Sequence, residues 1–149
     1  MKRIIRLIIV LFLTGFNINI YAESTAAADG AALYSEALYF KNLALQSEKP
    51  EEKNSYLDKA IEKLEKAKDT GDALGRVYFQ LSEIYFLKGD IASSEKFAGI
   101  SIEKESNYFP PYNRLYGIMM ERKQNREAAD LIEKYLAAEP DDPYALYLL

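Results

Sequence analysis

Residues 75–108 read GRVYFQLSEIYFLKGDIASSEKFAGISIEKESNY, and this stretch decides the fold. Steps of three and four residues, the spacing of one side of an α-helix, connect Leu74, Tyr78, Leu81, Tyr85 and Lys88. Gly89 can take the left-handed conformation that ends a helix, and Asp90 can cap the next one. A second helical stripe then carries Ile91, Ser94, Phe97 or Ala98, and Ser101 or Ile102. The stretch therefore predicts two helices joined by a short turn.

The rest of the chain from Ala31 onward carries the same helical spacing. The first stripe contains Leu33, Ala37, Phe40 and Ala44. After a break at Pro50, the next contains Leu57, Ala60, Ile61, Leu64 and Ala67, and it ends at Thr70, Gly71 and Asp72. A helix from Pro110 to about Arg122 carries Tyr112, Leu115, Tyr116 and Met119, and one from about Arg126 to Ala138 carries Ala128, Leu131, Ile132, Tyr135 and Leu136. No stretch shows the sustained alternation of a strand, so the sequence predicts an all-α fold.

An internal period of 34 residues relates these helices to one another. Positions 34 apart hold Tyr78 and Tyr112, Leu81 and Leu115, Ser94 and Ala128, Ser106 and Pro140, and Ala60 and Ser94. Two helices in a period of this length resemble the tetratricopeptide repeat family. One helix pair cannot bury its own apolar side, whereas stacked pairs share a core and about three are needed for stability.

The resemblance implies a right-handed α-solenoid of about three antiparallel helix pairs. Its domain covers 31–149, with units at about 31–72, 75–108 and 109–142 and a short segment at 143–149. Unit 75–108 matches the family pattern best, through Tyr78, Leu81, Ser82 and Tyr85 in its first helix and Ser94, Ala98 and Ser101 in its second.

The other two units depart from the family pattern. Lys123 stands where the turn glycine is expected, and Tyr116 stands where a small residue is expected. The first unit matches through Ala60, Leu64 and Ala67. Its first helix aligns only if about four extra residues are allowed around 47–53.

The N-terminus has the layout of a secretory signal peptide. Three basic residues precede an unbroken apolar run at 7–13, and Ala22 is the expected last residue removed. The alternative is an uncleaved membrane anchor, but Asn17 and Asn19 interrupt the run before the roughly 20 apolar residues that a span needs. We therefore expect a signal peptide at 1–22, a flexible linker at 23–30, and an exported, periplasmic protein. A secreted protein is a further alternative.

Composition excludes most familiar enzyme chemistries. The 149 residues are enough for one domain, and the absence of Cys and His removes thiol nucleophiles, imidazole bases and the usual zinc and iron–sulfur ligands. Adjacent acids at Glu51 and Glu52 and at Asp141 and Asp142 stand at helix starts, where they cap rather than catalyse. We expect no catalytic residue, no metal site and no cofactor.

Charge argues against a nucleic-acid partner. Residues 1–22 hold three basic and no acidic side chains, so the net charge of −4 becomes −7 over residues 23–149. Binding to nucleic acid depends on clustered Lys and Arg that neutralise phosphates, and no such cluster occurs. The only membrane contact expected is that of the signal segment before cleavage.

In proteins of the tetratricopeptide-repeat family, the first helices line a concave groove that holds a peptide. The resemblance assigns to this groove Arg76, Phe79, Glu83, Phe86 and Leu87 in one unit and Asn113, Gly117, Met120 and Glu121 in the next, with Lys41 and Leu45 as further additions. Phe79, Phe86 and Met120 are apolar but lie off the core stripe. Either they contact a ligand, or another helix, such as one folded back from the N-terminus, covers them.

Tyrosines form a second set of candidates, since the chain holds 12. Tyr78, Tyr85 and Tyr112 fall on core positions of the repeat. Less constrained are Tyr34, Tyr39, Tyr108 and Tyr144, and amphipathic Tyr is favoured at interfaces.

The apolar segment 143–149 begins a short helix after an Asp142 cap. Two accounts of it stay open: it packs on the last helix, or it inserts into another copy or another protein through Tyr144, Tyr147 and Leu148, which would make a homo-oligomer.

These observations predict a non-enzymatic adaptor in a cell-envelope assembly. Its groove would bind a peptide or a partner protein with little loss of entropy, because the groove is rigid before binding. The alternative is a carrier that binds a small hydrophobic ligand in a Tyr- and Phe-rich groove.

Overall fold

The structure is a computed structural model that describes residues 29–70 and 75–149. A helix covers residues 29–46. It is followed by α2 (Pro50–Lys68), α3 (Gly75–Leu87), α4 (Ile91–Lys104), α5 (Phe109–Glu121), α6 (Asn125–Leu136) and α7 (Pro143–Tyr147). The expected signal peptide, the cleavage site and the break at Gly71 and Asp72 lie outside the described residues. Asp29 and Gly30 were expected in the linker, but both are helical.

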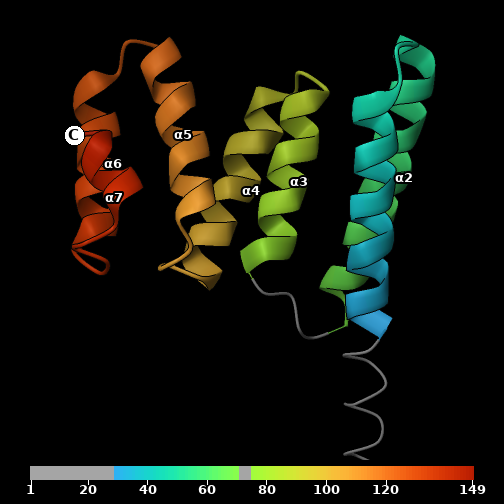
Figure 1. Ribbon diagram of the computed structural model, residues 1–149, viewed down its shortest axis with the longest axis horizontal. Helices are drawn as coiled ribbons and strands as arrows, with labels where there is room; N and C mark the ends of the chain where they lie inside the picture. Colours follow the sequence, from blue (N-terminus) through green and yellow to red (C-terminus); the bar gives the residue numbers. More distant parts are fainter. Residues whose placement is uncertain (1–28, 71–74) are drawn as a thin grey trace, which may run out of the picture.

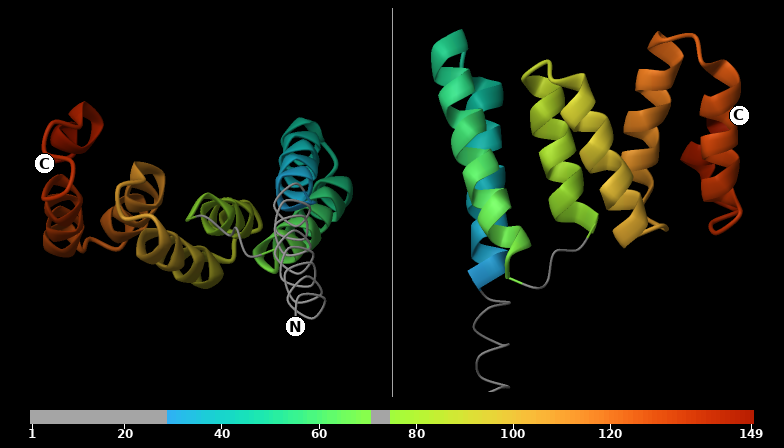
Figure 2. Two further views of the ribbon diagram at one scale, coloured as in Figure 1. Left: turned by 90° about the horizontal axis from the view of Figure 1, so that it is seen from below. Right: turned by 180° about the vertical axis from the view of Figure 1, so that it is seen from behind.

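The helices stand side by side in one row, and each packs on the helix before it (Figure 1). Views from below and behind show the same succession of helix pairs (Figure 2). The ranges 29–70 and 75–149 contain helices and turns and no strand. The prediction of an all-α protein with repeat-like helix packing is therefore confirmed.

Helix ends follow the local signals in the sequence. Pro50 opens α2, with two acidic residues in the first turn and basic residues in the last, which complements the helix dipole. Asp90 caps α4, because its carboxylate accepts a hydrogen bond of 3.0 Å from the backbone N–H of Ser93. Asp142 caps α7 in the same way, through the N–H groups of Tyr144 and Ala145.

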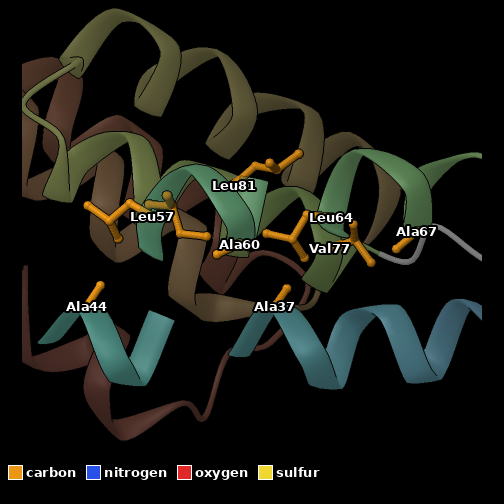
Figure 3. Close-up of a cluster of buried hydrophobic side chains, with 9 residues drawn as sticks. Ala37, Ala44, Leu57, Ala60, Leu64, Ala67, Val77 and Leu81 are labelled. Carbon is orange, nitrogen blue, oxygen red and sulfur yellow. The ribbon is translucent and has the colours of Figure 1, made fainter. Parts of the chain in front are cut away.

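The first core lies among helix 29–46, α2 and α3 (Figure 3). It consists of Ala37, Ala44, Leu57, Ala60, Leu64, Ala67, Val77, Leu81 and Ile84. Alanines line the buried side of helix 29–46, opposite the leucines of α2, so the two helices can approach closely.

The second core joins α5, α6 and α7 to the end of α4. It contains Ile102, Tyr112, Ile132, Tyr135 and Ala145. The Tyr135 ring lies 5.0 Å from the Tyr112 ring and 5.0 Å from the Phe109 ring, between ring centroids. Aromatic packing therefore replaces the small residues that fill the first core.

Small residues lie where α3 and α4 cross. Ser82 and Ser94 are both fully buried, and their hydroxyl oxygens lie 3.1 Å apart in a hydrogen bond. Ser101, also fully buried, donates a hydrogen bond of 2.7 Å to the backbone carbonyl of Gly75. The expected small positions at Ser82, Ser94 and Ser101 are thus buried at the contact between the two helices.

The buried side of α3 differs from the expected stripe. Leu81 is buried as expected, but Val77 and Ile84 join it in the core, while Tyr78 and Tyr85 are only half-buried. Both tyrosine rings stack on Phe97 of α4, with centroids 6.5 Å and 5.4 Å away. Lys88, the last member of the expected stripe, is exposed and pairs with Asp58.

Gly75 is a packing requirement of this arrangement. A Cβ there would lie 2.7 Å from the Ser101 carbonyl oxygen and 2.6 Å from the Glu105 Cβ. At Gly99, inside α4, a Cβ would meet nothing within 4 Å.

We expect Gly75→Ala to lower the free energy of unfolding by about 2 kcal/mol, because the added methyl group forces α3 and α4 apart. Gly99→Ala is the matched control and should raise it by about 0.5 to 1 kcal/mol, since Ala favours a helix. Urea denaturation followed by circular dichroism measures both. Equal effects of the two substitutions would contradict the close approach at Gly75.

Two turns of the row use the left-handed backbone conformation. Gly89, between α3 and α4, has φ +79°, and Lys123, between α5 and α6, has φ +61°. Lys123 therefore adopts the conformation expected of the missing glycine. A side chain makes this conformation less favourable by about 1 to 2 kcal/mol.

Replacing Lys123 by Gly should raise the free energy of unfolding by up to about 1 kcal/mol, because the left-handed strain outweighs the added freedom of the unfolded chain. Gly89→Ala should lower it by about 1 kcal/mol. Lys134→Gly in α6 is the control for glycine in a helical conformation and should also lower it by about 1 kcal/mol. A destabilised Lys123→Gly variant in urea denaturation would count against the strained turn.

Candidate functional site

Side chains from helix 29–46, α3 and α5 meet on one surface, although α2 and α4 separate these helices in the sequence. Two polar contacts, between Lys41 and Gln80 and between Glu83 and Arg114, connect them. We call this surface the first-helix face. Its members are Tyr34, Lys41, Arg76, Phe79, Gln80, Glu83, Phe86, Tyr108 and Arg114.

An ion pair lies at the centre of the first-helix face. Arg114 Nε donates a hydrogen bond of 3.0 Å to Glu83 Oε1, and Arg114 Nη2 contacts the same oxygen. Each side chain is only 23% exposed. The guanidinium carbon of Arg114 also lies 3.8 Å from the centroid of the Phe86 ring. Arg114 is therefore held in one orientation by a carboxylate and an aromatic ring.

Lys41 lies beside this ion pair. Its ammonium donates a hydrogen bond of 2.5 Å to Gln80 Oε1. Burial lowers the pKa of Lys41; Glu83 opposes this effect and the positive charge of Arg114 adds to it. The ammonium is thus a partly desolvated cation that donates to a neutral amide. A carbonyl or carboxylate oxygen from a ligand would be a favourable further acceptor.

Aromatic rings lie at the other end of α3. The Phe79 and Tyr108 rings meet edge to face with centroids 5.6 Å apart. The guanidinium of Arg76 lies 5.5 Å from the centroid of Tyr108, and its Nε lies 3.6 Å from Glu105 Oε1. Burial raises the pKa of the Tyr34 hydroxyl, which neighbours Arg76 and Gln80, and burial also raises the pKa of Tyr108. This end therefore presents phenol groups and an exposed guanidinium over apolar rings.

The residues that the resemblance assigned to a groove fall into two groups. Contacts described above place Lys41, Arg76, Phe79, Glu83 and Phe86 together on the first-helix face. Leu87 instead packs partly buried against the first core. Exposed positions hold Leu45, Asn113, Gly117, Met120 and Glu121.

Phe79 and Phe86 are half-buried rather than free in solvent. Tyr108, just before α5, covers part of Phe79, and Arg114 of α5 covers part of Phe86. Part of the expected cover therefore comes from the next unit of the chain. Met120 remains exposed.

Gln80 and Arg114 were not among the residues expected in the groove. Both are polar and lie off the apolar stripes, so hydrophobic spacing gives no signal for them. They are 34 positions apart, however, and so occupy equivalent places in two units. Following the period through polar positions would have identified them.

Segment 143–149 packs on the last helix pair through one side of α7. Ala145 is fully buried in the second core, and Leu148 packs against it. The Tyr116 hydroxyl donates a hydrogen bond of 3.2 Å to the Leu148 carbonyl, so this tyrosine holds the segment in place. Tyr144 and Tyr147 are exposed. Leu148 therefore belongs to the inner side, unlike the two tyrosines with which it was grouped.

A hydrogen bond between Tyr135 and Asp142 anchors the start of α7. The Tyr135 hydroxyl donates to Asp142 Oδ2 at 2.9 Å, and the other carboxylate oxygen accepts from the first N–H groups of α7. Burial, followed by the contact with Asp142, raises the pKa of Tyr135 to about 12. Backbone hydrogen bonding, that from Ala145 above all, lowers the pKa of Asp142.

These two pKa shifts predict how the anchor depends on pH. The raised pKa of Tyr135 stabilises the fold fully below its unfolded value of about 10, and this contribution is lost as the pH rises towards about 12. The lowered pKa of Asp142 stabilises the fold above its unfolded value of about 3.9, and this contribution is lost at lower pH.

Tyr135→Phe should lower the free energy of unfolding by about 1.5 kcal/mol near pH 7, because the hydrogen bond to a carboxylate is lost. The difference from the wild type should stay constant between pH 5 and 9 and shrink above pH 10, where the wild type loses the contribution of Tyr135. Urea denaturation across pH measures it. A difference that grows above pH 10 would show that Tyr135 is not held in its protonated form.

Other features of the described chain add no binding chemistry to the first-helix face. A hollow of about 400 Å³ is lined by Lys49, Pro50, Glu51 and Glu52 at the start of α2. Within residues 29–70 and 75–149, no group of three or more acidic side chains is placed to hold a metal ion. No helix in these ranges is long and apolar enough to cross a bilayer.

Comparison with known proteins does not assign the chain to a family: no family model matches it, and no curated protein is significantly similar.

Proposed function

We propose that this protein is an exported, non-enzymatic adaptor of the tetratricopeptide-repeat type that binds a peptide or a partner protein on its first-helix face. The N-terminal segment with basic and then apolar residues supports export to the periplasm. The period of 34 residues and the buried serines at the crossing of α3 and α4 support a solenoid of repeats.

The contact between the first helices of three successive pairs carries the proposal. Lys41 meets Gln80, and Glu83 meets Arg114, so side chains from three helices form one continuous surface. In a solenoid with this period, the first helices line the inner side. A ligand placed there would touch all three pairs at once.

The chemistry of the face suits a polypeptide. Phe79 and Phe86 offer half-buried aromatic surface for apolar anchors, which dominate the affinity of most interfaces. Lys41, Arg76 and the two tyrosine hydroxyls offer donors for main-chain carbonyls and carboxylates. Because Arg114 is already held by Glu83 and Phe86, little side-chain entropy is lost on binding.

We expect a photo-crosslinking residue at Arg76 to form an adduct with a partner in intact cells. The same residue at Tyr39, which is exposed but about 200° around its helix from Lys41, should form none. In the Arg76 probe, Phe79→Ala combined with Phe86→Ala should lower the adduct yield at least about tenfold, the loss expected for two anchor residues. Gel analysis of the adducts measures the yield.

The alanine variants also need a test of folding, because both rings are half-buried. Circular dichroism should show unchanged helix content, and Tyr39→Ala should leave the adduct intact. A second variant, Arg76→Glu with the probe moved to Asn113, changes only exposed positions and should also weaken capture. Equal adduct yields in all these variants would refute the first-helix face as the binding site.

A further inference from the structure

α7 presents an apolar side to solvent at the end of the row (Figure 2). Four large side chains on it are exposed: Tyr144 (74%), Leu146 (52%), Tyr147 (88%) and Leu149 (59%). We call these four residues the α7 face. Single exposed apolar residues are common on proteins, but four within six positions form a patch that needs an explanation.

The α7 face is held in place rather than free to fray. Ala145 and Leu148, on the opposite side of the same segment, pack in the second core. Tyr135 and Tyr116 bind the two ends of the segment, at Asp142 and at the Leu148 carbonyl. A partner would therefore meet a preorganised surface and order little of it on binding.

The α7 face carries no charge. Residues 143–149 include no Asp, Glu, Lys or Arg, and the nearest carboxylate, Asp142, is already bound by Tyr135 and by backbone N–H groups. A partner with charged groups in its contact surface would leave them unpaired here. A second copy of the same face brings no like charges together and leaves none unpaired.

The area of the face agrees with a pair of copies. With about 200 Å² for a tyrosine side chain and slightly less for a leucine, the four residues expose about 500 Å². Two copies would bury about 1,000 Å², the lower bound for a specific interface. A single face of this size is as large as the largest apolar patch found on ordinary monomers.

We propose that the α7 face is the contact between two copies of this chain, related by a two-fold axis. Tyr144 and Tyr147 of each copy pack on the leucines of the other. Such a contact uses the same patch on both copies, so assembly stops at two. The proposal does not depend on what the first-helix face binds.

Sedimentation equilibrium of the purified protein tests this. The wild type should reach a dimer and no larger species as its concentration rises. Tyr147→Glu should raise the dimer dissociation constant at least about tenfold, because it places two carboxylates at the axis. Tyr39→Glu, at a tyrosine that is 61% exposed on helix 29–46, is the matched control and should leave the dimer unchanged. Both variants should keep the wild-type melting temperature, since both side chains are exposed.

Single cysteines give an independent readout, because the natural chain has none. Tyr147→Cys should be crosslinked into a dimer by a short bismaleimide, and Tyr39→Cys should not. A wild type that stays monomeric up to about 100 μM would overturn the proposal, since an interface of this size binds in the micromolar range. Growth into species larger than a dimer, or loss of binding to phosphatidylglycerol vesicles as the only effect of Tyr147→Glu, would also overturn it.

Discussion

Close approach of helices at small residues is the constraint on which the rest of this structure depends. Ser82 and Ser94 are fully buried where α3 crosses α4, and Gly75 lies against the Ser101 carbonyl at the end of the same crossing. Because the two helices nearly touch, α4 does not hold α3 and α5 far apart. Side chains of α3 and α5 can therefore reach each other, and the first-helix face exists only because they do.

The two cores differ in what joins them. Apolar contacts hold helix 29–46, α2 and α3 together, and a second apolar cluster holds α5, α6 and α7. Across the boundary, two ion pairs accompany the packing of α4 on α5. Glu83 binds Arg114 on the first-helix face, and Glu95 binds Arg122 with both guanidinium nitrogens, at 2.5 Å and 2.9 Å. Ion pairs are more directional than apolar contacts, so they define the register of α5 against the preceding pair.

The surface of the protein divides into regions with different chemistry. The first-helix face mixes aromatic rings with cations and an ion pair, as expected of a surface that recognises polar and apolar groups together. The α7 face is apolar and neutral and suits only another neutral surface. These two regions come from different parts of the repeat pattern, and a change in one need not affect the other.

Local signals in the sequence were sufficient for much of the fold. Spacing of apolar residues, Gly89, Pro50 and the two aspartate caps predicted the helices and most of their ends, because each depends on residues within one or two turns. The period of 34 residues identified the small positions that turned out to be buried. It also led to Arg76, Phe79, Glu83 and Phe86, which the structure brings together with Lys41.

Only the tertiary structure decided how these side chains are used. Arg114 and Gln80 carry no apolar periodicity, so their place on the first-helix face became visible once α5 and helix 29–46 lay against α3. The same holds for α7, where Leu148 faces inward and Tyr147 outward, since five helical residues give no reliable apolar side until a neighbour covers one. By itself the sequence determined the helices and their repetition, because these depend on neighbours along the chain. The composition of each surface depends on neighbours in space, which only the packed structure supplies.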